Sequence, residues 1–154
     1  MHAPELRNVR ILADLNNSQL DDLLNYGKVL HLREGEIVIQ QGTAADAMFL
    51  LLKGKLGTYV TDAAGNETHL RTIETGGHFG EIGLLQSGIR TATIRTLSPS
   101  MIFRLDPGSF NELLKVPELA VPFLHGLSRS LAIRLADITS RFANSRAFKE
   151  AWTI

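Results

Sequence analysis

The residues best suited to chemistry lie in one stretch, residues 77–94. It contains one carboxylate and one arginine among several glycines. Arg90 carries a planar guanidinium that can donate two parallel hydrogen bonds to a phosphate. Thr91 adds a hydroxyl donor beside it, and Glu81 is a strong acceptor suited to a sugar hydroxyl. Together these side chains provide donors for one phosphodiester anion and an acceptor for a ribose.

The backbone of this stretch also favours an anion. Gly80 lets the main chain approach a ligand closely. Residues 81–86 are expected to form one helical turn or slightly more, and the first N–H groups of such a turn lack internal partners. Gly88 then reverses the chain, and Arg90 is expected to enter a strand.

Short apolar runs, separated by turn-forming residues about every ten positions, must hold this stretch in place. Asp62-Ala-Ala-Gly65-Asn66 predicts a hairpin turn, because Gly and Asn tolerate positive φ. Many short strands joined by tight turns predict a sandwich or jelly-roll barrel. The expected strands are residues 29–32, 37–40, 47–52, 55–60, 67–73, 91–96 and 100–105.

Helical patterns precede the strands. Residues 4–12 predict a short helix or helical turn. Asn17 or Ser18 is expected to cap a second helix, which Gly27 is well placed to end.

Two further helices are expected after the strands. Ser109 is a candidate cap for the first, and the Val116–Pro117 pair interrupts it, because the residue before proline avoids the helical region. A longer helix follows from about Glu118 to Phe142 or beyond. Its apolar stripe has helical spacing, so it either packs on the chain's own core or forms a self-dimerising seam, and the two can coexist. The stripe comprises Leu124, Leu127, Leu131, Leu135, Ile138 and Phe142.

Composition excludes several classes of function. Sixteen basic residues balance sixteen acidic ones, which argues against non-specific nucleic-acid binding. The absence of cysteine excludes disulfides, thiolate zinc sites and thiol nucleophiles. The first ten residues lack the apolar core of a secretory signal, and no apolar run approaches the roughly 20 residues of a membrane span. We therefore expect a soluble, cytoplasmic protein that contacts no membrane.

The stretch Phe79-Gly80-Glu81 … Arg90-Thr91-Ala92-Thr93-Ile94 resembles the phosphate-binding cassette of the cyclic-nucleotide-binding domain family. That family includes the bacterial catabolite activator, regulatory subunits of cyclic-AMP-dependent kinase and cyclic-nucleotide-gated channels. The resemblance extends over roughly residues 10 to 140. It also covers Arg33-Glu-Gly35-Glu36, Gln41-Gly42, Ala45-Asp46, Met48-Phe49-Leu50-Leu51, Gly54 and Gly57.

The resemblance implies a mainly β fold, an eight-stranded β-roll (a double-stranded β-helix or jelly roll) with flanking helices. We expect a single domain over residues 1–154. Its parts would be N-terminal helices over about 1–27, a β-roll over 28–106 that contains the cassette 79–94 with its short helix, and C-terminal helices over 109–145.

The resemblance also implies a ligand, cyclic AMP or cyclic GMP, and a role for each cassette residue. Glu81 would accept the ribose 2′-hydroxyl and Arg90 would pair with the cyclic phosphate. Thr91 permits cyclic GMP without requiring it, since a threonine there contacts the guanine amino group in relatives that use cyclic GMP. The other expected ligand contacts are Phe79, Gly80, Ile82, Gly83 and Ala92, and the candidates for covering the base are Arg134, Ile138 and Thr139.

The function expected from this pattern is a sensor that couples ligand binding to movement of its C-terminal helices and catalyses nothing itself. It would need no cofactor and no metal. Its partners would be a second copy joined through the long helix and an unidentified downstream protein. Direct DNA binding is not expected, because no helix-turn-helix pattern follows the long helix.

Three alternatives stay open. The pocket could be vestigial in a module that mainly dimerises, or the chain could be the sensor domain of a larger transcription regulator or channel. A jelly roll could also hold a cupin-type metal site, but the five histidines have no helical pair spacing and no accompanying carboxylate set.

Overall fold

The computed structural model describes residues 4–86, 88–144 and 150. Two four-stranded antiparallel sheets form its centre, with strand orders β1-β8-β3-β6 and β2-β7-β4-β5. The strands are β1 (Lys28–Leu32), β2 (Ile37–Ile39), β3 (Met48–Lys53), β4 (Lys55–Thr61), β5 (Glu67–Glu74), β6 (His78–Phe79), β7 (Thr93–Thr96) and β8 (Ser100–Leu105). The expected eight-stranded β-roll is confirmed, as two sheets rather than a closed barrel.

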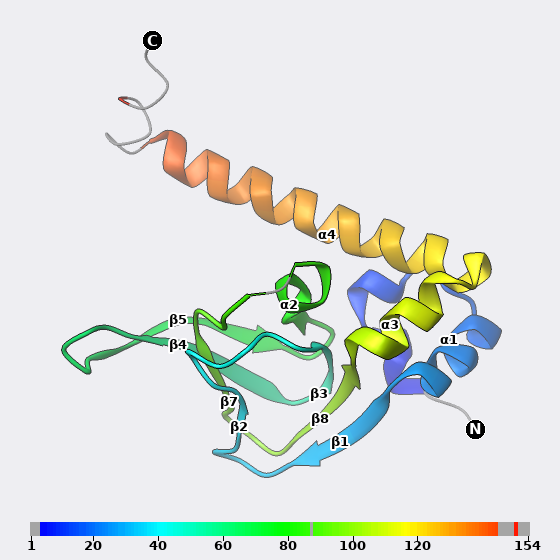
Figure 1. The fold of residues 1–154 in the computed structure, drawn as a ribbon, viewed down its shortest axis with the longest axis horizontal. Helices are drawn as coiled ribbons and strands as arrows, with labels where there is room; N and C mark the ends of the chain where they lie inside the picture. Colours follow the sequence, from blue (N-terminus) through cyan, green and yellow to red (C-terminus); the bar gives the residue numbers. More distant parts are fainter. Residues whose placement is uncertain (1–3, 87, 145–149, 151–154) are drawn as a thin grey trace.

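The N-terminal helices, α3 and the start of α4 gather at one end of the sheets, and α4 then runs past the cassette helix α2 (Figure 1). The helices are η1 (Pro4–Asn8), η2 (Arg10–Leu12), α1 (Asn17–Leu23), η3 (Leu24–Tyr26), α2 (Glu81–Leu85), α3 (Pro107–Leu114) and α4 (Pro117–Ala143). Ser87 of the cassette, residues 1–3 of the N-terminal part and Ser145 of the C-terminal part lie outside the described residues.

The strand predictions differ from the structure mainly around the cassette. Strand β6 was not predicted, because two residues are too few to show alternation. The strand expected at Thr91 begins only at Thr93. The main chain of Arg90 instead pairs with a neighbouring loop, donating to the Thr43 carbonyl at 2.7 Å and accepting from the Gly42 N–H at 2.8 Å. The predicted hairpin turn is confirmed, with Gly65 at φ 87°.

The expected N-terminal caps are wrong by one or two residues. Asn16, rather than Asn17 or Ser18, caps α1, and its side chain accepts from the Gln19 N–H at 2.8 Å while the Gln19 side chain accepts from the Asn16 N–H. This reciprocal capping box satisfies two otherwise free donors. Gly27 does end η3, but in extended backbone, and a side chain there would collide with the ring of Phe103.

The third helix also begins earlier than expected. Asp106 occupies the N-cap position and Pro107 the first turn, so Ser109 lies inside α3. Proline suits the first turn because its missing N–H would have no partner there. The break at Val116–Pro117 is confirmed, and the long helix then runs to Ala143.

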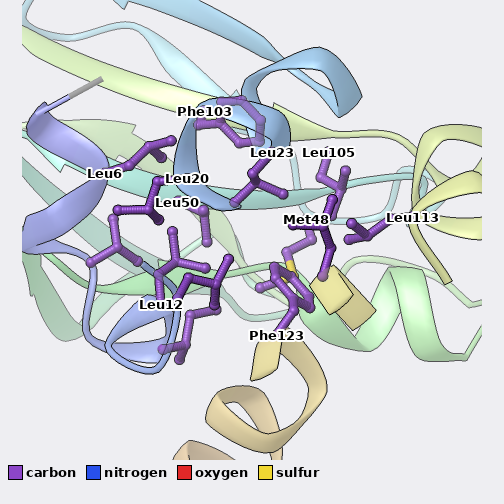
Figure 2. Packing of buried hydrophobic residues seen from close by; sticks show 14 of the residues in the cluster. Leu6, Leu12, Leu20, Leu23, Met48, Leu50, Phe103, Leu105, Leu113 and Phe123 are labelled. Carbon is purple, nitrogen blue, oxygen red and sulfur yellow. The ribbon is translucent and has the colours of Figure 1, made fainter. Parts of the chain in front are cut away.

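The larger core cluster joins the N-terminal helices to β3, β8, α3 and the start of α4 (Figure 2). Phe123 and Leu127 of α4 are buried in it, and Leu131 packs at its edge. Gly126 permits the close crossing of α4 over η2, because a side chain there would collide with the Ile11 carbonyl.

The apolar stripe of α4 therefore divides in two. Its first half packs on the chain's own core, so for that half the expectation of packing within the chain is confirmed. Its second half does not, since Leu135, Ile138 and Phe142 are 65%, 53% and 50% exposed. In the part of the chain that the structure describes, no helix is both long and apolar enough to cross a lipid bilayer.

Candidate functional site

A tight turn between β6 and α2 places the cassette. Gly80 caps α2 in the left-handed conformation, at φ 80°. A Cβ atom added there would lie 2.9 Å from the Ala47 carbonyl oxygen and 3.1 Å from Arg90 Nη1. Glycine is required at this turn on both counts, because a side chain would be strained and would displace the guanidinium.

Main-chain carbonyls orient the Arg90 guanidinium. Its Nη2 donates to the Ala47 carbonyl at 2.6 Å and its Nη1 to the Gly80 carbonyl at 3.3 Å. Asp46 lies at the edge, 3.8 Å from Nη2. Burial lowers the pKa of Arg90, and the neighbouring carboxylates of Asp46 and Glu81 oppose that shift. These contacts fix the cation while leaving part of its five-donor fork for a ligand.

A cavity of about 270 Å³ opens beside this cation. All eight expected ligand contacts line it, so the fold brings them to one place. They are Phe79, Gly80, Glu81, Ile82, Gly83, Arg90, Thr91 and Ala92. The Gly83 N–H already donates to the Gly80 carbonyl at 3.1 Å, which makes it a less direct anion donor than the sequence suggested.

Glu81 points into the same region from the first turn of α2 and is only 3% exposed. Its Oε1 accepts a hydrogen bond from Arg134 Nη1 of α4 at 2.6 Å. The imidazole Nε2 of His78 lies 3.9 Å from the same oxygen. The carboxylate is therefore paired with the long C-terminal helix.

The three candidates for covering a base separate in the structure. Arg134 lines the cavity. Ile138 and Thr139 lie about one turn further along α4, and both are exposed outside the cavity lining of this chain. Of the three candidates, Arg134 alone lines the cavity of this chain.

Two cavity residues were missed from the sequence. Arg71 of β5 and Thr58 of β4 both line the cavity. The Thr58 hydroxyl is buried and has no hydrogen-bond partner among the described residues. Both lie inside predicted strands, where side chains alternate between faces. Without the register of the two sheets, the sequence did not show which face they occupy.

No group of three or more histidine or acidic side chains that could hold a metal ion occurs in the described part of the chain. The donors around the cavity are instead suited to an organic anion.

The fold and the site together define a ligand-binding β-roll with an arginine and a carboxylate on one cavity. The family model described as "Cyclic nucleotide-binding domain" matches residues 29–116. The chain belongs to this cyclic nucleotide-binding domain family, as its cassette indicated.

Characterised relatives include both kinases and transcription regulators. The chain is 34% identical over 140 residues to cGMP-dependent protein kinase, isozyme 1, of Drosophila melanogaster, covering 88% of this chain and 18% of the kinase. It is 35% identical over 113 residues to the cAMP-activated global transcriptional regulator CRP of Pasteurella multocida, covering 72% of this chain and 52% of that protein. It thus spans about a fifth of the kinase and about half of the regulator.

The crystal structure of the Thermus thermophilus catabolite activator protein has a similar fold. The TM-score is 0.76 at 25% identity, and the match covers 87% of this chain and 62% of the other.

Proposed function

We propose that this chain is a regulatory domain that binds one cyclic nucleotide and carries no catalytic step of its own. The observation that carries the proposal is that Arg90 and Glu81, from the two ends of the cassette, line one cavity of about 270 Å³. The Arg90 fork would donate to the cyclic phosphate and Glu81 would accept from the ribose 2′-hydroxyl. Charge-assisted bonds of this kind are stronger than neutral ones.

We further propose cyclic GMP as the preferred nucleotide. Guanine carries two adjacent acceptors, O6 and N7, and arginine donates to them as a pair. Arg71 lines the cavity and supplies such a fork, while Thr91 offers a hydroxyl to the amino group. Adenine has an amino donor in place of O6, so it would match Arg71 less well. The kinase relative from Drosophila melanogaster is named for cyclic GMP.

The contact between Glu81 and Arg134 provides the coupling to α4. A ribose hydroxyl that bonds to Glu81 competes with Arg134 for the same carboxylate, so occupancy of the cavity changes what holds this part of α4. A ligand shifts such an equilibrium only by its differential affinity for the two arrangements. The exposed apolar half of α4 would then meet a second copy of the chain or a downstream protein.

Calorimetric titration of Arg90→Gln with cyclic GMP and cyclic AMP tests the assignment. Loss of a charge-assisted contact of about 1.5–3 kcal/mol should raise Kd roughly 10- to 150-fold. Arg104→Gln is the matched control, because Arg104 contacts the same Asp46 at 3.7 Å yet does not line the cavity. Equal nucleotide affinities for wild type and Arg90→Gln would defeat the proposal. Failure of the folded wild type to bind either nucleotide would favour a vestigial pocket.

A further inference from the structure

A second cavity, of about 250 Å³, lies between β5, the turn before β6, η2 and α4. The side chains that matter for its chemistry are Arg10, Arg71, Arg134, His78, Glu74 and Ser130. Arg71 and Arg134 line the nucleotide cavity as well, so these two arginines form the wall between the two cavities.

The charge of this second cavity is unbalanced. Its lining carries three guanidinium groups and a single carboxylate, that of Glu74. Arg10 and Arg71 make no side-chain hydrogen bond and no ion pair with any described residue. Arg134 has one partner, Glu81, which belongs to the neighbouring cavity. Like charges that line one cavity repel one another, and a bound anion would relieve that repulsion.

A buried imidazole adds an independent observation. His78 lines the same cavity, and its side chain is only 6% exposed. Its Nε2 atom makes no hydrogen bond in the described part of the chain. Buried polar atoms are seldom left unpaired, because the lost hydration is not replaced.

We propose that the second cavity binds a phosphate-type oxyanion, and that its occupancy strengthens cyclic-nucleotide binding next door. Arginine forks match tetrahedral oxyanions, and a dianion would neutralise the excess of two positive charges over negative ones in the lining. The cavity also has room for a small group esterified to the phosphate. Inorganic phosphate and a phosphate monoester share this chemistry.

The coupling follows from the position of Arg134, and this part of the proposal rests on the proposed function. An anion in the second cavity attracts the Arg134 guanidinium away from Glu81 Oε1, where it now donates at 2.6 Å. The freed carboxylate can accept the ribose 2′-hydroxyl without displacing a cation. Linkage is reciprocal, so the nucleotide would strengthen anion binding by the same factor.

Titration of nucleotide-free protein with inorganic phosphate, against chloride at equal ionic strength, tests the site itself. We expect saturable binding that Arg10→Gln weakens and that Ser130→Asp, which adds a carboxylate to the cavity wall, abolishes. Arg33→Gln removes an exposed arginine outside both cavities and should leave phosphate binding unchanged. The absence of saturable binding, or binding that ignores both cavity variants, would overturn the site. A parallel titration with glycerol 3-phosphate identifies which source binds more tightly.

A second titration, with cyclic GMP in the presence and absence of saturating phosphate, tests the coupling. Phosphate should lower the Kd of wild type roughly fivefold or more, and Arg10→Gln should remove this effect. Weaker cyclic GMP binding in phosphate would place the anion in the nucleotide cavity and overturn the coupling. Protein that binds phosphate through Arg10 but binds no nucleotide would refute the proposed function while leaving the anion site intact.

Discussion

Glu81 is a buried carboxylate whose strong hydrogen bond comes from a residue 53 positions away, Arg134. A carboxylate in this setting is costly to bury unless it is paired. Arg134 also lines the cavity, so under the proposed function a sugar hydroxyl would compete with it for this carboxylate.

Glu81→Ala tests the role of this carboxylate in binding ribose. If Glu81 accepts the 2′-hydroxyl, 2′-deoxy cyclic GMP should bind wild type about tenfold more weakly than cyclic GMP, since a hydrogen bond to a charged group is worth roughly 1.5 kcal/mol or more. The same comparison in Glu81→Ala should show little difference. A penalty for the 2′-deoxy ligand that persists in the variant would place the ribose elsewhere.

The stability of the fold should depend on pH through His78. Burial lowers the pKa of this imidazole below its ordinary value of 6.5. Glu81 opposes that shift, while Arg134, Arg71 and Arg10 add to it. The unfolded chain therefore takes up a proton before the folded one, so stability should fall as the pH drops below 6.5 and level off below the folded-state pKa.

Urea unfolding at several pH values measures this effect in wild type and His78→Gln. The variant is expected to lose stability less steeply between pH 6.5 and pH 5, whatever its absolute stability. Parallel pH profiles for the two proteins would show that His78 is not the titrating group.

The residues of the cassette could be predicted from the sequence because their types and order are local. Arg71, Thr58 and the pairing of Glu81 with Arg134 could not, since each depends on how distant strands and α4 are placed around the cavity.

Helix α4 is held near the cassette by Arg134 and near the N-terminal helices by Arg129. The Arg129 guanidinium donates to Asp14 at 2.9 Å, and neither residue lines the nucleotide cavity. The two arginines lie on one helix, carry the same charge and bind different parts of the chain, so they form a matched pair.

Hydrogen exchange of residues 131–143 tests the proposed coupling. In wild type we expect cyclic GMP to change the exchange of this half of α4, because the ligand competes for Glu81. Arg134→Ala should still bind nucleotide but lose most of that response, whereas Arg129→Ala should keep it. A full response in Arg134→Ala would mean that α4 senses the ligand by another route.

The elements themselves were predictable to different degrees. Short apolar runs separated by turn-forming residues predicted seven strands, but β6 has only two residues and β7 begins two residues later than expected. Strand β7 begins late because the main chain of Arg90 pairs with Gly42 and Thr43 instead. This contact spans more than 45 positions, so no local pattern encodes it.

For the molecule as a whole, the exposed half of the α4 stripe is the clearest candidate for contact with a second copy. Leu135, Ile138 and Phe142 follow at spacings of three and four on one side of the helix. The sequence predicted this stripe, but only the packing of the core shows that Leu135 and Ile138 lie outside it.

Analytical ultracentrifugation of Ile138→Asp tests a homodimer joined through this surface. We expect wild type to dimerise, and a buried aspartate at the seam to shift the protein to monomer while cyclic-nucleotide binding is retained. Ile133→Asp is the control, because Ile133 is 65% exposed on the opposite side of the helix. Monomeric wild type, or equal dissociation by both variants, would count against this interface.

A crystal structure of the chain grown with cyclic GMP would show where the nucleotide lies in the cavity. We expect cyclic phosphate oxygens within hydrogen-bonding distance of the Arg90 guanidinium, the 2′-hydroxyl on Glu81, and Arg134 no longer donating to Oε1. A cavity that stays empty at saturating nucleotide, or a nucleotide whose phosphate lies away from Arg90, would contradict this expectation.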